Sequence, residues 1–202
     1  MGSPRSLATG LLLALFCASA SAQAPVPRIR GTVEKFQDGA LTVKTREGPS
    51  MVVKFGEKFG VLGVVPAALA DIGTGKFVGI ATLGTKDGAP VALEVLIFPD
   101  NMKGAGEGHY GWDLKPGSMM TNATVEGVVL EAKDRLLTLK YKDGEQKILV
   151  PEACPVVTFV PSDAGALKPG AHVFISRPAR AADGSITAAG VAVGLNGLVP
   201  PM

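Results

Sequence analysis

Hydrophobic and polar residues alternate along short stretches of this chain with a period of two. Leu41 and Val43 alternate with polar neighbours, and Leu137 and Leu139 do the same in the second half of the chain. This alternation predicts β-strands that bury one face. Asp-Gly pairs, such as the one at 87–88, separate several of these stretches and are typical of tight turns. The pattern predicts an all-β fold.

The chain contains an internal repeat. Residues 31–48 align with residues 127–144 without a gap, with glycine at both ends and a shared Asp-x-x-Leu-Thr-x-Lys pattern. After a single-residue adjustment, the register continues from 72–97 onto 167–193. Agreement over a stretch this long indicates that the two halves are copies of one module.

The pattern predicts five strands in each copy, with a short helical segment between the third and fourth strands, at 66–72 and at 162–167. This order is typical of a small five-stranded barrel of the oligonucleotide/oligosaccharide-binding (OB) type. We therefore expect two tandem OB-like barrels, while a pair of open sheets or a shared sandwich remain alternatives. The expected divisions are a first module at 28–98, a connector at 99–121, a second module at 122–195 and a tail at 196–202.

The N-terminal residues have the pattern of a secretory signal peptide. Arg5 precedes an apolar run from Leu7 to Ala18, and Ala20-Ser21-Ala22 is a small-x-small cleavage site. The apolar run is shorter than the roughly 20 residues that cross a bilayer. We therefore expect residues 1–22 to be removed and the mature chain to be soluble in the periplasm or secreted.

Composition narrows the classes of partner. Hydrophobic residues make up 47% of the chain and charged residues 19%, and the formal net charge is +2. Basic and acidic residues are interspersed, so the concentrated basic face that nucleic-acid binding needs is not expected. Cys154 is the only cysteine left after signal removal, which excludes an intramolecular disulfide; we expect it to be a small buried hydrophobe. The oligomeric state is left open.

Several segments carry a family resemblance. Residues 30–34, 41–44 and 167–175 resemble a widespread family of exported bacterial domains of unknown function, and residues 98–114 resemble uncharacterised proteobacterial periplasmic proteins that hold such domains in tandem. Members are sometimes labelled as metal ABC transporter components. The resemblance implies a fold and a compartment but no activity, and a literal permease is contradicted by the lack of spanning helices.

The connector concentrates residue types that are common in binding sites. It holds the only tryptophan, Trp112, together with Tyr110 and the ionisable residues Glu107, His109 and Asp113, on a glycine-rich segment. In one interpretation the two rings pack between the modules and fix their orientation. In another they form the platform of a ligand or partner site, with the three ionisable residues as polar contacts.

A third interpretation is a metal site, for copper or nickel, in which His109 acts with Glu107 or Asp113, or with Met119 and Met120 on a soft ion such as Cu(I). The spacing of a structural zinc site is absent. No nucleophile motif accompanies the connector residues, so we expect no enzyme activity and no cofactor. The sequence predicts a non-enzymatic periplasmic binding or adaptor protein of unknown ligand. The alternatives are an accessory protein of metal transport and a structural envelope protein.

Overall fold

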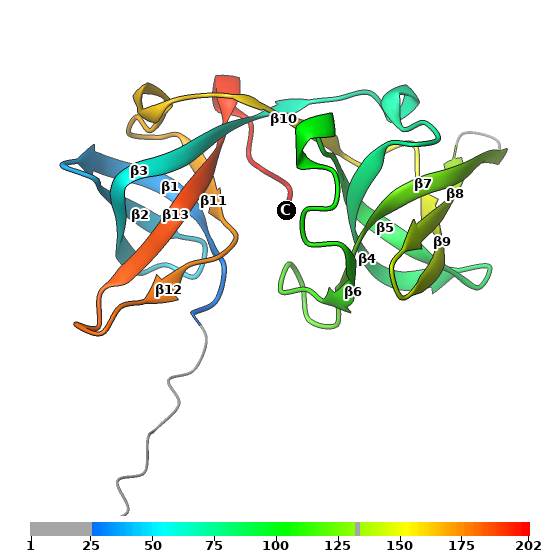
Figure 1. The fold of residues 1–202 in the computed structure, drawn as a ribbon, viewed down its shortest axis with the longest axis horizontal. Helices are drawn as coiled ribbons and strands as arrows, with labels where there is room; N and C mark the ends of the chain where they lie inside the picture. The colour runs from blue at the N-terminus through cyan, green and yellow to red at the C-terminus, as the bar shows by residue number, and fades with distance from the viewer. Residues whose placement is uncertain (1–25, 132–133) are drawn as a thin grey trace, which may run out of the picture.

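The protein is all-β, as the alternating pattern predicts (Figure 1). The computed structural model describes residues 26–131 and 134–202, so the predicted signal peptide at 1–22 lies outside the described residues. In the described part, helical structure is limited to four 3-10 turns of three residues each. None of these could cross a membrane.

The strands of the two halves correspond through the sequence alignment, with the long β3 matching β9 and β10, and β4 matching β11 and β12. The first half contains β1 (Ile29–Gln37), β2 (Ala40–Thr45), β3 (Ser50–Pro66), β4 (Phe77–Lys86) and β5 (Ala89–Ile97). The second half contains β7 (Met119–Glu131), β8 (Asp134–Tyr141), β9 (Gly144–Val150), β10 (Val156–Pro161), β11 (His172–Ile175), β12 (Ala179–Arg180) and β13 (Ile186–Gly194). The connector adds β6 (Gly108–Gly111) and η2 (Asp100–Met102), and η4 (Leu195–Gly197) follows β13. The predicted helical segments are the single turns η1 (Leu69–Asp71) and η3 (Ala164–Ala166).

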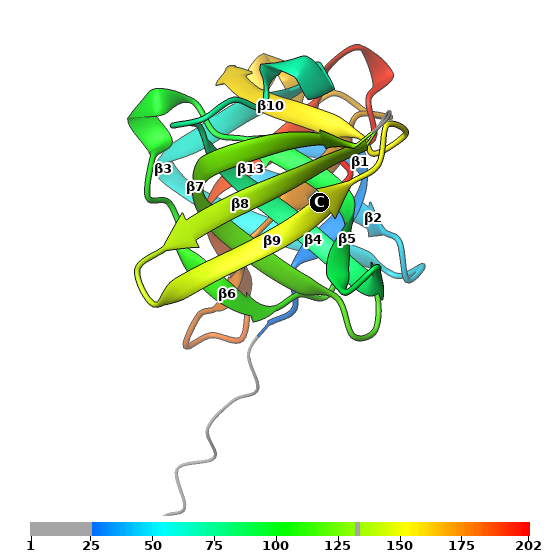
Figure 2. The same cartoon turned by 90° about the vertical axis from the view of Figure 1, so that its right-hand side faces the viewer.

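Each of the two lobes is built from strands of both halves. In the first lobe β1, β2 and β3 pair with β11 and β13, which come from the second half. In the second lobe β7, β8 and β9 pair with β4 and β5, which come from the first half. Figure 2 shows the second lobe, with β7, β8 and β9 beside β4 and β5. β11 and β13 therefore complete the lobe of the first half, and β4 and β5 complete the lobe of the second half.

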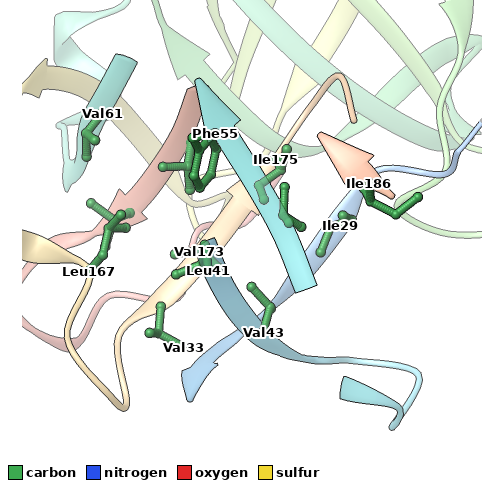
Figure 3. Close-up of a cluster of buried hydrophobic side chains, with 13 residues drawn as sticks. Ile29, Val33, Leu41, Val43, Phe55, Val61, Leu167, Val173, Ile175 and Ile186 are labelled. Atoms are coloured by element: carbon green, nitrogen blue, oxygen red, sulfur yellow. The ribbon is translucent and has the colours of Figure 1, made fainter. Parts of the chain in front are cut away.

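The two hydrophobic cores follow the same exchange. The first core joins residues from 29–61 to residues from 167–193 (Figure 3). The second joins residues from 72–97 to residues from 123–156. Inward-facing residues such as Leu41 and Val43 in the first lobe, and Leu137 and Leu139 in the second, are fully buried. Neither half can bury its own apolar faces without strands from the other.

The exchange takes place where β3 and β10 cross between the lobes (Figure 1). The two strands pair antiparallel from Leu62 opposite Pro161 to Pro66 opposite Val157. β10 also runs parallel to β5, so that all the described strands belong to one hydrogen-bonded sheet. The all-β class is confirmed, but the pairing does not show two tandem five-stranded barrels with helices. Alternation along a strand specifies its buried face, whereas it does not specify which copy supplies the neighbouring strand.

The exchange of strands predicts which pair of introduced cysteines will form a disulfide. Thr32 on β1 lies directly opposite His172 on β11. In a Cys154→Ser background, Thr32→Cys with His172→Cys should oxidise to an intramolecular disulfide that mass spectrometry detects after proteolysis, because paired strand residues lie within disulfide reach. Val128 occupies the repeat position that matches Thr32, so Val128→Cys with His172→Cys should stay reduced. A 128–172 disulfide would show instead that each half pairs with itself.

Candidate functional site

A cavity of about 460 Å³ lies between the two lobes. The first lobe contributes Gly60 and Leu62 from β3, Phe174 from β11, and Gly190 and Ala192 from β13. The second lobe contributes Gly79, Glu94, Leu96, Met120 and Asn122 from β4, β5 and β7. The connector supplies Met102, Ala105, Gly106, Tyr110 and Trp112. The cavity therefore depends on both lobes and on the segment that joins them.

Strand alternation explains why these side chains reach the cavity. On β5, Val95 and Ile97 point into the core of the second lobe, while Glu94 and Leu96 lie on the opposite face, which meets the other lobe. An apolar cluster spans this interface, with Val64, Phe77, Leu96, Phe98, Val157, Phe174, Ala192 and Met202 as its buried members. The outer faces of the lobes are thus apolar where they meet, and the cavity opens within this interface.

Four side chains that line the cavity carry buried polar atoms without a hydrogen-bond partner. The atoms are Nε of Arg28, both carboxyl oxygens of Glu94, Nε1 of Trp112 and Oδ1 of Asn122. In the described part of the chain, these are all the buried side-chain nitrogen and oxygen atoms that lack a partner. Such atoms are costly and are rare in folded proteins. All of these atoms belong to residues that line the same cavity.

Glu94 is the least expected of these residues, since its side chain is only 1% exposed. Burial raises its pKa to about 8, and the nearby backbone N–H of Ala81 and the charge of Arg30 oppose this effect only in part. At neutral pH the carboxyl group therefore keeps its proton. An acidic side chain in an apolar strand destabilises the fold unless something else compensates for its burial.

Asn122 is held in a defined orientation by the connector. Its Nδ2 donates to the carbonyl of Ala105 at 3.1 Å and to the hydroxyl oxygen of Tyr110 at 3.2 Å. The Tyr110 hydroxyl donates in turn to the carbonyl of Gly106 at 3.2 Å. Asn122 Oδ1 then lies over Gly79, where a Cβ would come within 2.6 Å of it. Gly106 adopts a φ of +62°, which favours glycine, so both glycines are needed for this arrangement.

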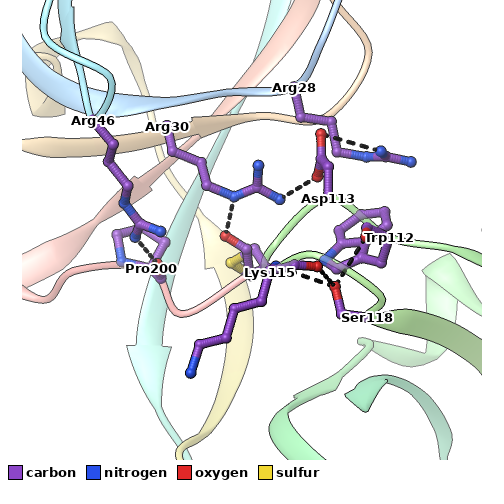
Figure 4. Close-up of polar contacts among 9 residues, drawn as sticks. Arg28, Arg30, Arg46, Trp112, Asp113, Lys115, Ser118 and Pro200 are labelled. Carbon is purple, nitrogen blue, oxygen red and sulfur yellow. Dashed lines mark hydrogen bonds and ion pairs between the residues drawn. The ribbon is translucent and has the colours of Figure 1, made fainter. Parts of the chain in front are cut away.

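An arginine–aromatic cluster fixes the connector against the first lobe (Figure 4). The Arg28 guanidinium lies 3.8 Å from the centroid of the Trp112 ring, and its Nη1 is 3.4 Å from Oδ2 of Asp113. Arg30 Nη2 donates to Oδ1 of Asp113 at 2.7 Å, while its Nε donates to the carbonyl of Met202 at 2.8 Å. These contacts join the two lobes on one side of the cavity and bring the Trp112 ring to its wall.

The loop that carries Trp112 is closed by a serine. The Trp112 backbone N–H donates to the carbonyl of Ser118 at 2.8 Å, and the Ser118 hydroxyl lies 2.9 Å from the carbonyl of Trp112 and 2.7 Å from that of Lys115. Ser118 is buried, with 2% of its surface exposed. The conformation of the loop is therefore stabilised by hydrogen bonds within the loop itself.

The predicted contact residues are divided between two places. Tyr110 and Trp112 line the cavity, and Asp113 lies beside it in its ion pairs. Glu107 and His109 do not line it. On β6 the side chains alternate, so that His109 points away from the face that carries Tyr110.

Glu107 and His109 contact the second lobe instead. The Glu107 carboxylate accepts the backbone N–H of Lys142 at 3.0 Å. His109 Nδ1 lies 2.8 Å from the Thr121 hydroxyl, and its ring is stacked on that of Tyr141 at a centroid distance of 6.3 Å. Both residues hold the connector to the second lobe.

The residues of the metal alternative are not gathered at one point. His109 is paired with Thr121 on β7, while Met120 is paired with Tyr110 and lines the cavity. Met119 and Met120 are neighbours on one strand and point to opposite faces. The described residues contain no group of three histidine, cysteine, aspartate or glutamate side chains that could hold a metal ion.

Sequence reasoning did not identify Glu94, Asn122 or Arg28. A signal for Glu94 is visible, since it is the one charged residue in the apolar run 91–98. Cys154 contacts the core of the second lobe, and burial followed by the negative charge of Glu94 raises its pKa to about 12. Its thiol is therefore unreactive near neutral pH.

No family model, curated protein or solved structure matches this chain.

The buried carboxyl group predicts an unusual pH dependence of stability. The pKa of Glu94 rises from 4.5 to about 8 on folding. The free energy of unfolding of the wild type should therefore fall as the pH rises through that interval. Glu94→Gln does not titrate. Its free energy of unfolding in urea should match that of the wild type near pH 4.5 and exceed it by about 4 kcal/mol at pH 8. Glu126→Gln, an exposed control, should follow the wild type, and parallel profiles for Glu94→Gln and the wild type would contradict the assignment.

Asp113 predicts the opposite dependence. Burial raises its pKa, but hydrogen bonding to Arg30 and the charges of Arg30 and Arg28 outweigh this and hold the pKa below its ordinary value. Because the group is partly exposed, Asp113→Asn should lower the free energy of unfolding by about 1 kcal/mol at pH 7. The difference should disappear below pH 3.8, as the carboxylate is protonated. Asp100→Asn, at an exposed ion pair with Lys76, is the control and should have no effect.

Proposed function

We propose that this protein is a non-enzymatic binding protein that takes up a small, largely apolar molecule in the cavity between its lobes. The observation that carries the proposal is the convergence of unpaired buried polar atoms from Arg28, Glu94, Trp112 and Asn122 on that cavity. In an empty protein each of these atoms is a cost, whereas a bound molecule with matching groups removes it.

The size and walls of the cavity support this function. A volume of about 460 Å³ falls within the range of small-molecule sites, roughly 300–1,000 Å³. Aromatic and aliphatic side chains make up most of the wall, including Leu62, Leu96, Phe98, Phe159 and Phe174. An apolar wall with a few placed polar groups is the usual arrangement of a ligand site.

The entrance is formed by exposed residues of the first lobe. Ser176, Arg177 and Ala189 line the cavity and are exposed to solvent. Arg177 reaches the connector, where its Nη2 would lie 3.7 Å from a Cβ placed on Gly106. A ligand can therefore enter past these residues without separation of the lobes.

Binding without catalysis is proposed because Glu94, the acidic side chain in the cavity, contacts no nucleophile. Neither of its oxygens has a hydrogen-bond partner, so within the described part of the chain it has no hydroxyl or thiol to activate.

We also propose that the chain is an exported, duplicated protein whose lobes are OB-like barrels. The pattern of residues 1–22 supports export to the periplasm. The correspondence between the strands of the two halves supports duplication. The pairings β1–β2–β3–β13–β11, with β11 beside β1, and β7–β8–β9–β5–β4, with β4 beside β7, support an OB-like order in which strands are exchanged.

Trp112 offers a direct test of the cavity, because it is the only tryptophan and lines the wall. The uncharged dye N-phenyl-1-naphthylamine should bind and accept energy from Trp112. Ala189→Phe at the entrance should weaken this transfer-detected binding about tenfold or more. Ala182→Phe, an exposed alanine on the turn before β13 that does not line the cavity, should leave it unchanged. Equal binding by both variants would show that the dye, and the proposed site, lie elsewhere.

A further inference from the structure

One wall of the cavity presents only hydrogen-bond acceptors once Glu94 is ionised. Glu94 on β5 and Asn122 on β7 stand on either side of β4, where Ala81 is paired with Glu94 and Gly79 with Asn122. Three oxygens on this wall lack a partner: both from Glu94 and one from Asn122. On this face β4 carries Gly79 and Ala81, while Ile80 between them points into the core of the second lobe, so no large side chain from that strand separates the two acceptors.

The donors on this wall are already used within the protein. Asn122 donates to Ala105 and Tyr110, and the Tyr110 hydroxyl donates to Gly106. The Ala105 carbonyl can only accept, which fixes the Asn122 amide with its oxygen unpaired. The donors that the free oxygens need must therefore come from a ligand.

The cationic side chains near the cavity do not donate hydrogen bonds to Glu94 either. Arg28 lines the cavity, but it lies against Trp112 and pairs with Asp113. Arg30 is hydrogen-bonded to Asp113 and Met202, and its charge reaches Glu94 without a hydrogen bond. Arg177 lies at the exposed entrance. The other ionisable group near Glu94 is the thiol of Cys154, which is neutral.

The remaining walls favour an apolar body, and the unpaired N–H groups of Arg28 and Trp112 lie among them. The rings of Tyr110, Trp112, Phe98, Phe159 and Phe174 all line the cavity. Aromatic faces attract cations, most strongly where water is excluded, and they also bind apolar rings and chains. A ligand with an ammonium group can thus meet the acceptor wall and the aromatic walls at the same time.

We infer that the ligand is an organic amine, bound as its ammonium ion, whose N–H groups donate to Glu94 and Asn122 while its apolar body lies among the aromatic rings. The inference rests on the proposed function and names the class of molecule that the cavity takes. Each N–H of an ammonium meets an acceptor that is otherwise unpaired, and its charge replaces the proton that Glu94 holds in the empty protein.

Three probes with the same phenyl body and different end groups test the inference. They are 2-phenylethylamine, 2-phenylethanol and 3-phenylpropionate, titrated calorimetrically and by Trp112 emission at pH 8. The amine should bind about tenfold or more tightly than the alcohol, and the acid should bind least. Glu94→Gln should abolish the preference for the amine and leave the affinity for the alcohol within twofold. Glu126→Gln, at an exposed pair with Lys140, should change neither affinity.

The pH dependence gives an independent readout. Between pH 6 and 7, binding of the amine requires Glu94 to release its proton, so the affinity should rise about tenfold over that unit and level off above pH 8. The probe stays an ammonium ion throughout this range, since alkylamines have pKa values near that of lysine, about 10. The affinity for 2-phenylethanol should be flat, and so should the amine profile of Glu94→Gln.

The outcomes separate the two proposals. If the alcohol or the acid binds as tightly as the amine, or if Glu94→Gln keeps the preference for the amine, the inference about the ligand class is overturned while the cavity remains a binding site. If none of the three probes binds and Ala189→Phe also leaves the binding of the dye unchanged, the proposed function fails as well.

Discussion

The burial of each lobe's core depends on strands that come from the other half of the chain. β11 and β13 complete the sheet that β1, β2 and β3 begin, and β4 and β5 do the same for the second lobe. Since hydrophobic burial is the main stabilising contribution to folding, the two halves of the chain cannot be separated without opening both cores. The lobes themselves meet through the apolar cluster between them and through the pairing of β3 with β10.

The cavity between the lobes is open because the two repeats differ where they face each other. Glu94 and Leu96 line the cavity from β5, and the matching positions of the second repeat, Gly190 and Ala192, line it from β13. A large residue in one copy thus has a small counterpart in the other, and the pair does not fill the gap. Gly190 is further constrained, because a Cβ there would come within 2.9 Å of the carbonyl oxygen of Gly60.

The polar groups of the cavity cost stability in the empty protein. Glu94 is buried without a hydrogen bond, and Asn122 and Trp112 each leave one atom unpaired. Folded proteins keep such groups mostly where they act on a ligand, and other parts of the structure compensate. Here the ion pairs of Asp113 with Arg28 and Arg30, together with the exchanged cores, provide that support. The site is therefore held by elements that do not themselves need the ligand.

The amino-acid pattern by itself determined the all-β class, because alternation is a local property, and residue type singled out the connector with Tyr110 and Trp112 as a candidate site. It did not show that strands are exchanged, since either copy of a repeat offers the same edge to its neighbour. The sequence does not reveal the burial of Glu94 for a related reason. An outward-facing strand position is exposed in a single module and is buried only when a second lobe covers it. Which polar atoms remain unpaired, and that they meet in one cavity, was decided by the tertiary packing of the two lobes.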